Sequence, residues 1–330
     1  MKFNSPYFYL AFFLILNIFN FVDRNLLIAF APQIKSEFNL TNVQWGLLTG
    51  VYFLFFYSVF GIFMGVLGDK FSRMKIAAAG VFLWSLMTAV TGIAKNFSHL
   101  IFARALIGVG ESALTPNAIS MLSDLFKQNQ RGTASAIYYL GIPLGVGFGM
   151  LIAAFFGPIF GWRAVFIFLG LIGMGLGILT YFLFEPIRGQ LDINFDKTSK
   201  PNSIKDILSM TKSALYNSKC LTFVIIGSIF LHIPLGAGNF EVLWAVNERG
   251  FTASSYNSLF GFLFIIGGTV GALAGGILSD RLSHYFKGGV MTFLVISYII
   301  LTPLTVSYRF ISPDSYFFFF TLFFVSFNVT

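Results

Sequence analysis

Apolar runs long enough to cross a lipid bilayer recur along almost the whole of this chain. A transmembrane helix needs about 20 consecutive apolar residues, and its backbone must be hydrogen-bonded internally because hydrocarbon offers no partners. Of the 330 residues, 56% are hydrophobic and only 10% are charged, whereas a soluble domain carries about 25% charged residues. The sequence therefore predicts an all-α polytopic membrane protein.

The apolar runs form two blocks on either side of one long hydrophilic segment, residues 185–218. The second part of this segment, Ser203 to Leu215, is expected to lie along the membrane surface. A six-helix N-terminal half, residues 1–184, precedes this cytoplasmic linker, and an incomplete C-terminal half of about four helices, residues 219–330, follows it. The expected spans are 8–30, 45–68, 75–94, 97–123, 132–157, 162–184, 219–240, 256–279, 288–308 and one from about 315.

The basic residues give the expected orientation, because loops on the cytoplasmic side of a membrane are enriched in Lys and Arg. With the N-terminus inside, Arg24 and Arg104 lie within spans, and 14 of the other 19 lysines and arginines fall on the inner side. The exceptions on the outer side are Lys35, Lys95, Arg163, Arg249 and Arg309. The net charge of +8 is therefore assigned to the cytoplasmic face and not to nucleic-acid binding.

The stretch from Leu100 to Asn117 carries an arginine and a carboxylate in an otherwise apolar run. Arg104 and Glu111 are seven residues apart, about two helical turns, so they are expected on one helix face. Ionisable groups at membrane depth are costly and are functional by default. Gly108 and Gly110 lie between them and are expected to let a neighbouring backbone come close. A soluble helix with one internal ion pair is the alternative, which the composition disfavours.

A short glycine-aspartate-arginine sequence occurs twice, after the second run and after the eighth. We expect Gly65 to permit a tight helix approach, and Asp69, Arg73 and Lys75 to form a charge cluster that holds one conformation and breaks in another. The alternative is that the basic residues only keep this loop inside. The second copy contains Gly276, Asp280 and Arg281.

This repeat makes the second and eighth helices equivalent positions of two six-helix halves, as in transporters built from parallel repeats. The second half here has about four helices, and the chain stops within an apolar run at Thr330. Two further helices are therefore expected in a longer protein, and a complete ten-helix protein is the alternative.

The first copy, Gly65 to Arg73, resembles the signature between the second and third helices of the major facilitator superfamily, although Ser72 replaces a glycine and Met74 precedes Lys75. The same resemblance extends over Arg104 to Glu111, Arg131-Gly132 and Gly161-Trp162-Arg163. Finer features resemble bacterial members of the spinster-type lipid transporter branch: Asp23-Arg24, residues 108–112, residues 123–126 and residues 138–145. Anion:cation symporters share the Asp-Arg of the first helix and the Arg and Glu of the fourth, and they remain the alternative.

The resemblance implies a secondary transporter that works by alternating access, coupled to protons and carrying an amphiphilic anion such as a lysolipid. The symporter alternative implies sugar acids or similar organic anions, and a non-transporting membrane protein or an inactive remnant is a third possibility. The expected partners are a small-molecule or lipid-like anionic substrate, protons and membrane lipids. The expected location is a bacterial inner membrane, with the N-terminus in the cytoplasm.

The candidate site lies on the first and fourth helices, which in this fold would both line the central cavity. The residues expected to couple protons to substrate are Asn17, Asn20, Asp23, Arg24, Arg104 and Glu111. Burial favours a neutral carboxylic acid and a nearby guanidinium favours the carboxylate, so a moving arginine changes proton affinity. Asp23 or Glu111 is the expected proton carrier, with an arginine as counter-charge and anchor for an anionic group. A static ion pair that fixes helix packing is the alternative.

Three further features complete the sequence analysis. Gly141, Pro143 and Gly145 are expected to bend the fifth helix, either as a hinge or as a groove for close packing. Arg131 is grouped with the gating residues because it follows the fourth helix. The sequence has no phosphate-binding loop with its lysine and no clustered metal ligands, so no enzymatic activity, cofactor or metal is expected.

Overall fold

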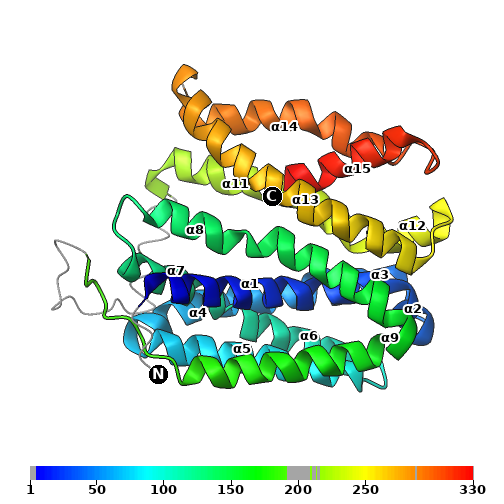
Figure 1. Ribbon diagram of the computed structural model, residues 1–330, viewed down its shortest axis with the longest axis horizontal. Helices are drawn as coiled ribbons and strands as arrows, with labels where there is room; N and C mark the ends of the chain where they lie inside the picture. Colours follow the sequence, from blue (N-terminus) through cyan, green and yellow to red (C-terminus); the bar gives the residue numbers. More distant parts are fainter. Residues whose placement is uncertain (1–4, 192–208, 210–212, 214–215, 287, 330) are drawn as a thin grey trace. The chain divides into compact units, whose positions relative to one another are not determined.

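The computed structural model describes the chain except for residues 1–4, 192–208, 210–212, 214–215, 287 and 330. The described residues form helices joined by turns and short loops, with no strand among them (Figure 1). All the expected spans coincide with helices, and seven helical stretches are long and apolar enough to cross a membrane. The all-α multi-pass fold is confirmed, whereas most of Ser203 to Leu215 lies outside the described residues.

The helices before the hydrophilic segment follow the apolar runs. They are α1 (Pro6–Ala29), α2 (Ala31–Glu37), α3 (Asn42–Gly46), the π-helix η1 (Leu47–Val51), α4 (Tyr52–Lys70), α5 (Arg73–Gly92), α6 (Phe97–Glu111), α7 (Leu114–Leu125), α8 (Arg131–Tyr139) and α9 (Gly141–Tyr181). Those after it are α11 (Lys219–Ala237), the 3₁₀ turn η2 (Gly238–Phe240), α12 (Glu241–Arg249), α13 (Ala253–Leu282), the 3₁₀ turn η3 (Ser283–Tyr285), α14 (Gly289–Ser307) and α15 (Tyr316–Val329).

Two long apolar stretches contain breaks that their sequences explain. Gly161 has φ 76° and ψ 157°, a left-handed backbone that glycine adopts without strain, so α9 comprises two spans that meet at this residue. Ser112 and Ala113 form a turn between α6 and α7, because Pro116 has no N–H to donate to the carbonyl of Ser112. The single helix expected over 97–123 is therefore two helices, and Glu111 ends the first.

The chain forms two compact units, each of which combines segments from both sides of the hydrophilic segment. The first unit contains Met1–Leu10, Ala31–Ser135 and Trp162–Leu243, and the second contains Ala11–Phe30, Ala136–Gly161 and Trp244–Thr330. The division of the sequence into halves on either side of residues 185–218 stays a prediction.

In the first unit, α4 to α7 lie side by side (Figure 1), and α5 and α6 touch through their backbones. A Cβ atom added to Gly80 would lie 2.6 Å from the carbonyl oxygen of Gly110, and one added to Gly110 would lie 2.8 Å from the amide nitrogen of Trp84. A Cβ on Gly108 would lie 2.7 Å from the carbonyl oxygen of Phe53. The close approach predicted for Gly108 and Gly110 is confirmed.

In the second unit, α13 packs against α15 and α14. A Cβ added to Gly267 would lie 3.1 Å from the carbonyl oxygen of Phe323, so this glycine admits the backbone of α15. The rings of Tyr256 and Phe260 stack along α13 with their centroids 5.7 Å apart. Close backbone contact and aromatic stacking thus both contribute to the packing of this unit.

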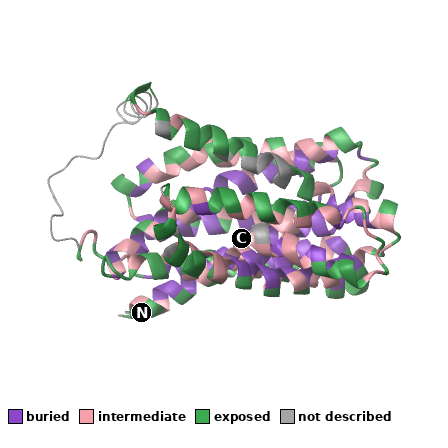
Figure 2. Ribbon diagram, turned by 90° about the horizontal axis from the view of Figure 1, so that it is seen from above, coloured by how far each residue is buried: buried purple, intermediate pink, exposed green. Residues whose placement is uncertain are grey.

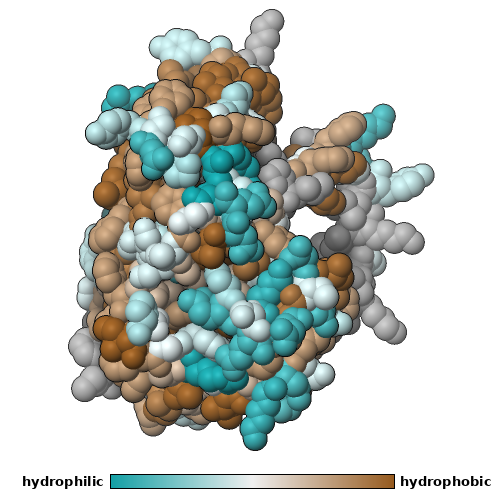
Figure 3. Space-filling model, turned by 90° about the vertical axis from the view of Figure 1, so that its right-hand side faces the viewer, coloured by the Kyte–Doolittle hydropathy of each residue, from teal (hydrophilic) through white to brown (hydrophobic). Residues whose placement is uncertain are grey.

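Buried and exposed residues alternate around the helices, and many exposed side chains are apolar (Figure 2). On α14 Phe293 is buried, whereas most of the other residues are exposed, and Ile299 is 68% exposed. Large exposed apolar surfaces mark regions that contact a membrane or a partner. On the face drawn in Figure 3, hydrophilic side chains gather toward the middle and hydrophobic ones border them on the left. This pattern fits helices whose ends meet water and whose sides meet lipid.

Candidate functional site

The first group of candidate residues lies on α1, within the second unit. Asn17, Asn20 and Asp23 are all buried, and the guanidinium of Arg24 lies 4.9 Å from the ring centroid of Phe21. The Asn17 side-chain amide donates to the carbonyl oxygen of Tyr138 at 2.8 Å. The amide nitrogen of Asn20 has no acceptor among the described residues. Asn17 therefore has an observed structural role, whereas Asn20 keeps an unused donor inside the protein.

The second candidate pair lies on α6 within the first unit, where Arg104 is 4% exposed and Glu111 is 1% exposed. The guanidinium of Arg104 lies 4.6 Å from the ring centroid of Phe53, a cation–π contact. Continuous helix from Phe97 to Glu111 gives the two side chains the predicted spacing of about two turns. Because Asp23 and Arg24 belong to the other unit, the expected meeting of the two pairs stays a prediction.

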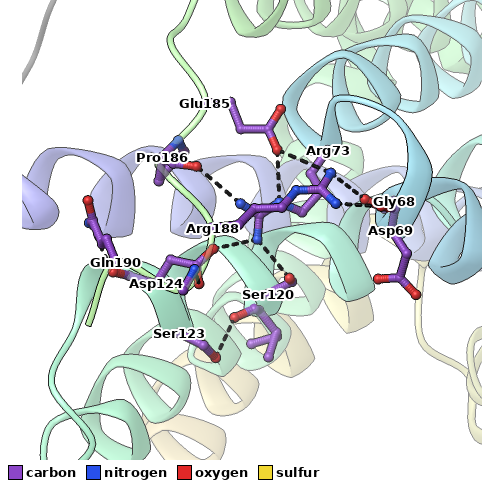
Figure 4. A network of polar contacts seen from close by, with 12 residues as sticks. Gly68, Asp69, Arg73, Ser120, Ser123, Asp124, Glu185, Pro186, Arg188 and Gln190 are labelled. Carbon is purple, nitrogen blue, oxygen red and sulfur yellow. Dashed lines mark hydrogen bonds and ion pairs between the residues drawn. The ribbon is translucent and has the colours of Figure 1, made fainter. Parts of the chain in front are cut away.

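Arg73 is the centre of a polar network at the end of the first unit that carries the loop after α4 (Figure 4). We call this the inner end, following the orientation expected from the sequence. One guanidinium nitrogen lies 2.5 Å from a carboxylate oxygen of Asp124 and 2.9 Å from the hydroxyl of Ser120. The Nε atom donates to Glu185 at 2.9 Å, and the remaining nitrogen donates to the carbonyl of Pro186. Arg73 is thus enclosed by partners from α7 and from the segment after α9.

Arg188 fixes the same segment to the end of α4. Its guanidinium donates to the carbonyl oxygens of Gly68, Asp69 and Phe71 at 2.5 to 2.7 Å (Figure 4). The last carbonyls of a helix have no partner within the helix and carry its negative dipole end, so a cation is well placed there.

Asp124 completes this attachment from α7. The amide of Gly189 donates to its carboxylate at 2.9 Å, and the side chain of Gln190 donates to its backbone carbonyl at 3.0 Å. Residues 185–190, which we call the strap, therefore hold the loop between α4 and α5 against α7.

Ser72 explains the departure from the family signature at its position. Its side chain accepts a hydrogen bond from the amide of Lys75 and so caps α5. Burial alone would raise the pKa of Glu185, but hydrogen bonds from Ser72 and Arg73 outweigh it and leave this pKa below its usual value. The serine thus connects the start of α5 to the strap.

The structure differs from the predicted charge cluster of Asp69, Arg73 and Lys75. Among the described residues, the Asp69 carboxylate makes no hydrogen bond or ion pair, and it points away from Arg73 (Figure 4). The ammonium group of Lys75 lies 5.6 Å from the ring centroid of Tyr181. Arg73 lies at the start of α5, where α7 and the strap supply nearer carboxylates, so the pairing with Asp69 is not made in this conformation and the gating cluster stays a prediction.

The tight approach predicted at Gly65 is not made in this conformation either, because a Cβ added there would meet nothing within 4 Å. The neighbour of Asp69, Gly68, has that role instead, since its Cβ would clash with the side chain of Asn117. Gly276 in the second copy of the sequence also has open space around it, and Arg281 is exposed. The side chain of Asp280 lies outside the described part of the chain.

Arg131 begins α8 at the inner end and is half-buried. Its Nε atom donates to the carbonyl oxygen of Phe126 at 3.2 Å. Phe126 is the residue that ends α7, so Arg131 holds the turn between α7 and α8. A gating role for Arg131 stays a prediction.

The opposite, outer end of the first unit is held by an ion pair between Glu37 and Arg163, 2.6 Å apart. Trp162 also donates to Glu37 at 2.8 Å, and Arg163 donates to the carbonyl oxygens of Gly92 and Ala94. This outer clamp joins α2, the end of α5 and the start of the second span of α9.

The hydrogen bond from Arg163 holds the pKa of Glu37 below its usual value, with a further bond from Trp162, against the effect of burial. A carboxyl group whose pKa is lower in the folded state than in the unfolded state adds stability above the unfolded value. That contribution to stability is lost as the pH falls through the pKa of the folded state. The outer clamp therefore weakens only in acid, below the ordinary range for a glutamate.

The proposed hinge residues pack closely against α1. A Cβ added to Gly141 would lie 2.7 Å from the side-chain nitrogen of Asn17, and one added to Gly145 would lie 2.5 Å from the carbonyl oxygen of Ile18. Pro143 lies in the first turn of α9, where a missing N–H costs little. Close packing is therefore observed for this segment, and its role as a hinge stays a prediction.

Sequence reasoning did not find Glu37, Ser120, Glu185 or Arg188 as members of these networks. Ser120 and Glu37 bind arginines that lie 47 and 126 residues away in the sequence. Arg188 binds backbone carbonyl oxygens that are similarly far away, such as that of Asp69, 119 residues before it. The sequence gives no signal for these partners, because periodicity identifies a helix face and does not say what that face meets. Among the described residues, no three His, Cys, Asp or Glu side chains could together hold a metal ion.

Comparison with known proteins agrees with this architecture. The protein spinster of Drosophila melanogaster is 28% identical over 291 residues, which are 84% of this chain and 46% of that protein. The sphingosine-1-phosphate transporter SPNS2 of Danio rerio is 32% identical over 53% of this chain and 36% of its own length. The probable L-galactonate transporter of Escherichia coli is 25% identical over 83% of this chain and 60% of its own length. The chain thus spans about half the length of the curated relatives it matches.

A solved structure shares the fold. The crystal structure of a bacterial homologue of the human lysosomal transporter spinster, in an inward-facing and unoccupied conformation, superposes with a TM-score of 0.81. It is 23% identical and covers 99% of this chain and 73% of its own chain. The family model of the Major Facilitator Superfamily matches residues 13–330. This chain therefore belongs to the major facilitator superfamily.

Proposed function

We propose that this protein is a secondary active transporter that works by alternating access, is coupled to protons and moves an amphiphilic or organic anion. Its family membership and its multi-pass helical fold support transport. The burial of charged groups in two spans supports coupling to protons, and the names of its relatives support an anionic substrate.

The observation that carries the proposal is the burial of two carboxylates in spans that also contain arginines. Asp23 is 2% exposed and Glu111 is 1% exposed, and Arg24 and Arg104 lie on the same two helices. A charged carboxylate at membrane depth is costly unless a proton or a cation neutralises it. If a carboxylate is neutralised by a proton in one conformation and by an arginine in the other, then proton binding is linked to the conformation of the protein.

The favoured substrate is lysolipid-like, because the relatives of this chain include several spinster proteins. One of them is named for sphingosine-1-phosphate, an amphiphile with a phosphate, while the Escherichia coli relative is named for L-galactonate, a sugar acid with a carboxylate. A guanidinium binds either group through paired N–H donors. We assign this anchoring to Arg104 or Arg24 and keep sugar acids as the second candidate class.

The proposal predicts that substrate changes the number of protons bound to the protein. The purified chain in weakly buffered detergent would receive a lysophospholipid or galactonate, and proton release or uptake would be recorded. We expect a signal with one ligand class, lost in Glu111→Gln because an amide cannot release a proton. Glu248→Gln, which alters an exposed glutamate, is the matched control. A Glu111→Gln protein with an undiminished signal removes Glu111 as carrier, and the same test on Asp23→Asn then decides between the two.

A further inference from the structure

Two arginines contact one tryptophan in the second unit. Trp244 and Arg249 lie on α12, and Arg309 lies in the turn between α14 and α15. The central carbon of each guanidinium lies 5.2 Å from the ring centroid of Trp244, within the range of a cation–π contact. Tyr308 packs against the same indole, with the two ring centroids 5.5 Å apart. We call these four side chains the arginine–tryptophan cluster.

The protein uses only part of the Arg249 guanidinium. Its Nη2 atom donates to the carbonyl oxygen of Ile311 and, at 3.5 Å, to that of Tyr308. Arg249 thus ties the end of α12 to the turn after α14. Its Nε atom is buried and has no acceptor among the described residues. Its Nη1 atom makes no hydrogen bond to a described residue either, and it is not enclosed, since the side chain is only half-buried. Arg249 therefore keeps unused N–H donors.

The cluster carries more positive than negative charge. Among the described residues Arg249 has no carboxylate partner, because its hydrogen bonds go to the two backbone carbonyls. Glu241, at the start of α12, is the buried carboxylate nearest in sequence, whereas Glu248 and Asp314 are exposed. One buried carboxylate would leave one of the two arginines unmatched. Guanidiniums that contact the same ring are at most about 10 Å apart, and like charges at that distance repel each other.

The surroundings of the cluster are those of a membrane interface. In the expected orientation both arginines are among the few basic residues on the outer side, where Trp and Tyr gather at the level of the lipid headgroups. Phe310, the neighbour of Arg309, is 84% exposed, and Tyr316, the first residue of α15, is 94% exposed. Exposed aromatic side chains of this kind mark contact with a membrane or a partner. Cationic donors and apolar surface therefore lie next to each other.

We propose that the arginine–tryptophan cluster binds the phosphate of an anionic phospholipid in the outer leaflet. A guanidinium binds a phosphate group through paired N–H donors, and Arg249 has donors to spare. The anion would also remove the repulsion between Arg249 and Arg309. Soluble phosphate would gain these charge contacts alone, whereas a lipid would also place its glycerol and upper acyl chains against Phe310 and Tyr316. This inference concerns the contact of the protein with its membrane and does not rest on the proposed transport function.

Stabilisation by added lipid tests the site. The purified full chain in a mild neutral detergent would be titrated with phosphatidylglycerol, and the rise in melting temperature would be recorded, since a ligand of the folded state stabilises it by mass action. We expect the concentration that gives half of the rise to increase about tenfold or more in Arg249→Gln, because hydrogen bonds to a charged group are lost. Lys95→Gln, which removes an exposed basic residue outside the cluster, is the matched control and should titrate like the parent protein. An unchanged titration of Arg249→Gln would overturn the proposal.

A second variant covers the case in which Arg249→Gln does not fold, because that variant also loses its bonds to Tyr308 and Ile311. Arg309→Gln leaves those bonds in place, and its titration should shift in the same direction. In native mass spectrometry it should retain fewer tightly bound phosphatidylglycerol molecules than the parent protein. Equal retention by Arg309→Gln and the parent would contradict the site.

The source of the phosphate is decided by a third titration. Inorganic phosphate and glycerol phosphate carry the charge without the acyl chains, so we expect neither to raise the melting temperature at concentrations where phosphatidylglycerol saturates. A rise with inorganic phosphate that equals the rise with phosphatidylglycerol, and that is lost in Arg249→Gln, would identify a site for soluble phosphate and overturn the lipid assignment.

Discussion

Replacing Arg73 by leucine is expected to lower the free energy of unfolding by about 3–5 kcal/mol, the usual cost of removing one partner from a buried ion pair. The side chains of Arg73 and Asp124 are only 5% and 10% exposed, so the remaining carboxylate would lack both water and its cation. Glu185 and the carbonyl of Pro186 would lose their donor as well. Unfolding of the purified protein by a denaturing detergent gives this free energy.

The double variant Arg73→Leu, Asp124→Leu separates the pair from the rest of the network. It should lose clearly less stability than the two single variants together, because neither charge is then left unmet. Glu37→Gln at the outer clamp is the control for an exposed pair, with side chains 36% and 42% exposed, and should cost at most about 1 kcal/mol. Strictly additive losses would show that Arg73 and Asp124 do not act together.

Gly110→Leu is expected to have an effect of similar size through sterics alone. The added side chain would begin 2.8 Å from the backbone of Trp84 and of Gly80, so α5 and α6 would have to separate. Overpacking of a core costs about 1–3 kcal/mol when side chains can adjust, and more when backbone blocks the space. With an unfolding entropy of about 2.1 cal/mol/K per residue over 330 residues, a loss of about 3 kcal/mol should lower the melting temperature in mild detergent by about 4 °C.

Gly175→Leu, in the second span of α9, is the matched control, because a Cβ there meets nothing within 4 Å. It makes the same chemical change at an exposed position of a span. Its melting temperature should stay close to that of the parent protein. Equal losses in the two variants would mean that the side chain itself, and not the contact between α5 and α6, is responsible.

The fold could be predicted from the sequence because the bilayer leaves few choices. A run of about 20 apolar residues has to become a helix, so length and hydropathy were enough to place the spans. The break at Ser112 was missed, although Pro116 marks it, because hydropathy does not register a lost hydrogen bond. The turn at Gly161 was placed correctly, since two spans were expected to meet there.

The partners of the charged residues were harder to predict than their positions. Asp69 and Lys75 are near Arg73 in sequence, but Asp124 and Glu185 are nearer in space. Periodicity identifies a helix face without saying which helix it meets, so the strap residues Glu185 and Arg188 gave no signal. The same limit applied to Gly65 and Gly68, only one of which packs tightly.

Buried polar groups also show what packing adds to sequence. Asn17 and Asn20 are both candidate coupling residues by sequence, yet the Asn17 amide donates to the backbone of Tyr138, whereas the Asn20 amide nitrogen has no acceptor among the described residues. Gly141 leaves room for this contact, since a Cβ added there would lie 2.7 Å from the side-chain nitrogen of Asn17. Asn20 is therefore the better candidate of the two for contact with a ligand.

Ligand flux driven by a proton gradient tests the central claim most directly. Proteoliposomes containing the full chain would hold a pH gradient of either sign, and movement of a labelled lysophospholipid or of labelled galactonate would be followed. We predict that one ligand class moves faster with the gradient than without it, and that a protonophore removes the difference. Equal movement with and without the gradient would contradict proton coupling, and no protein-dependent movement of either ligand would contradict transport of these anions.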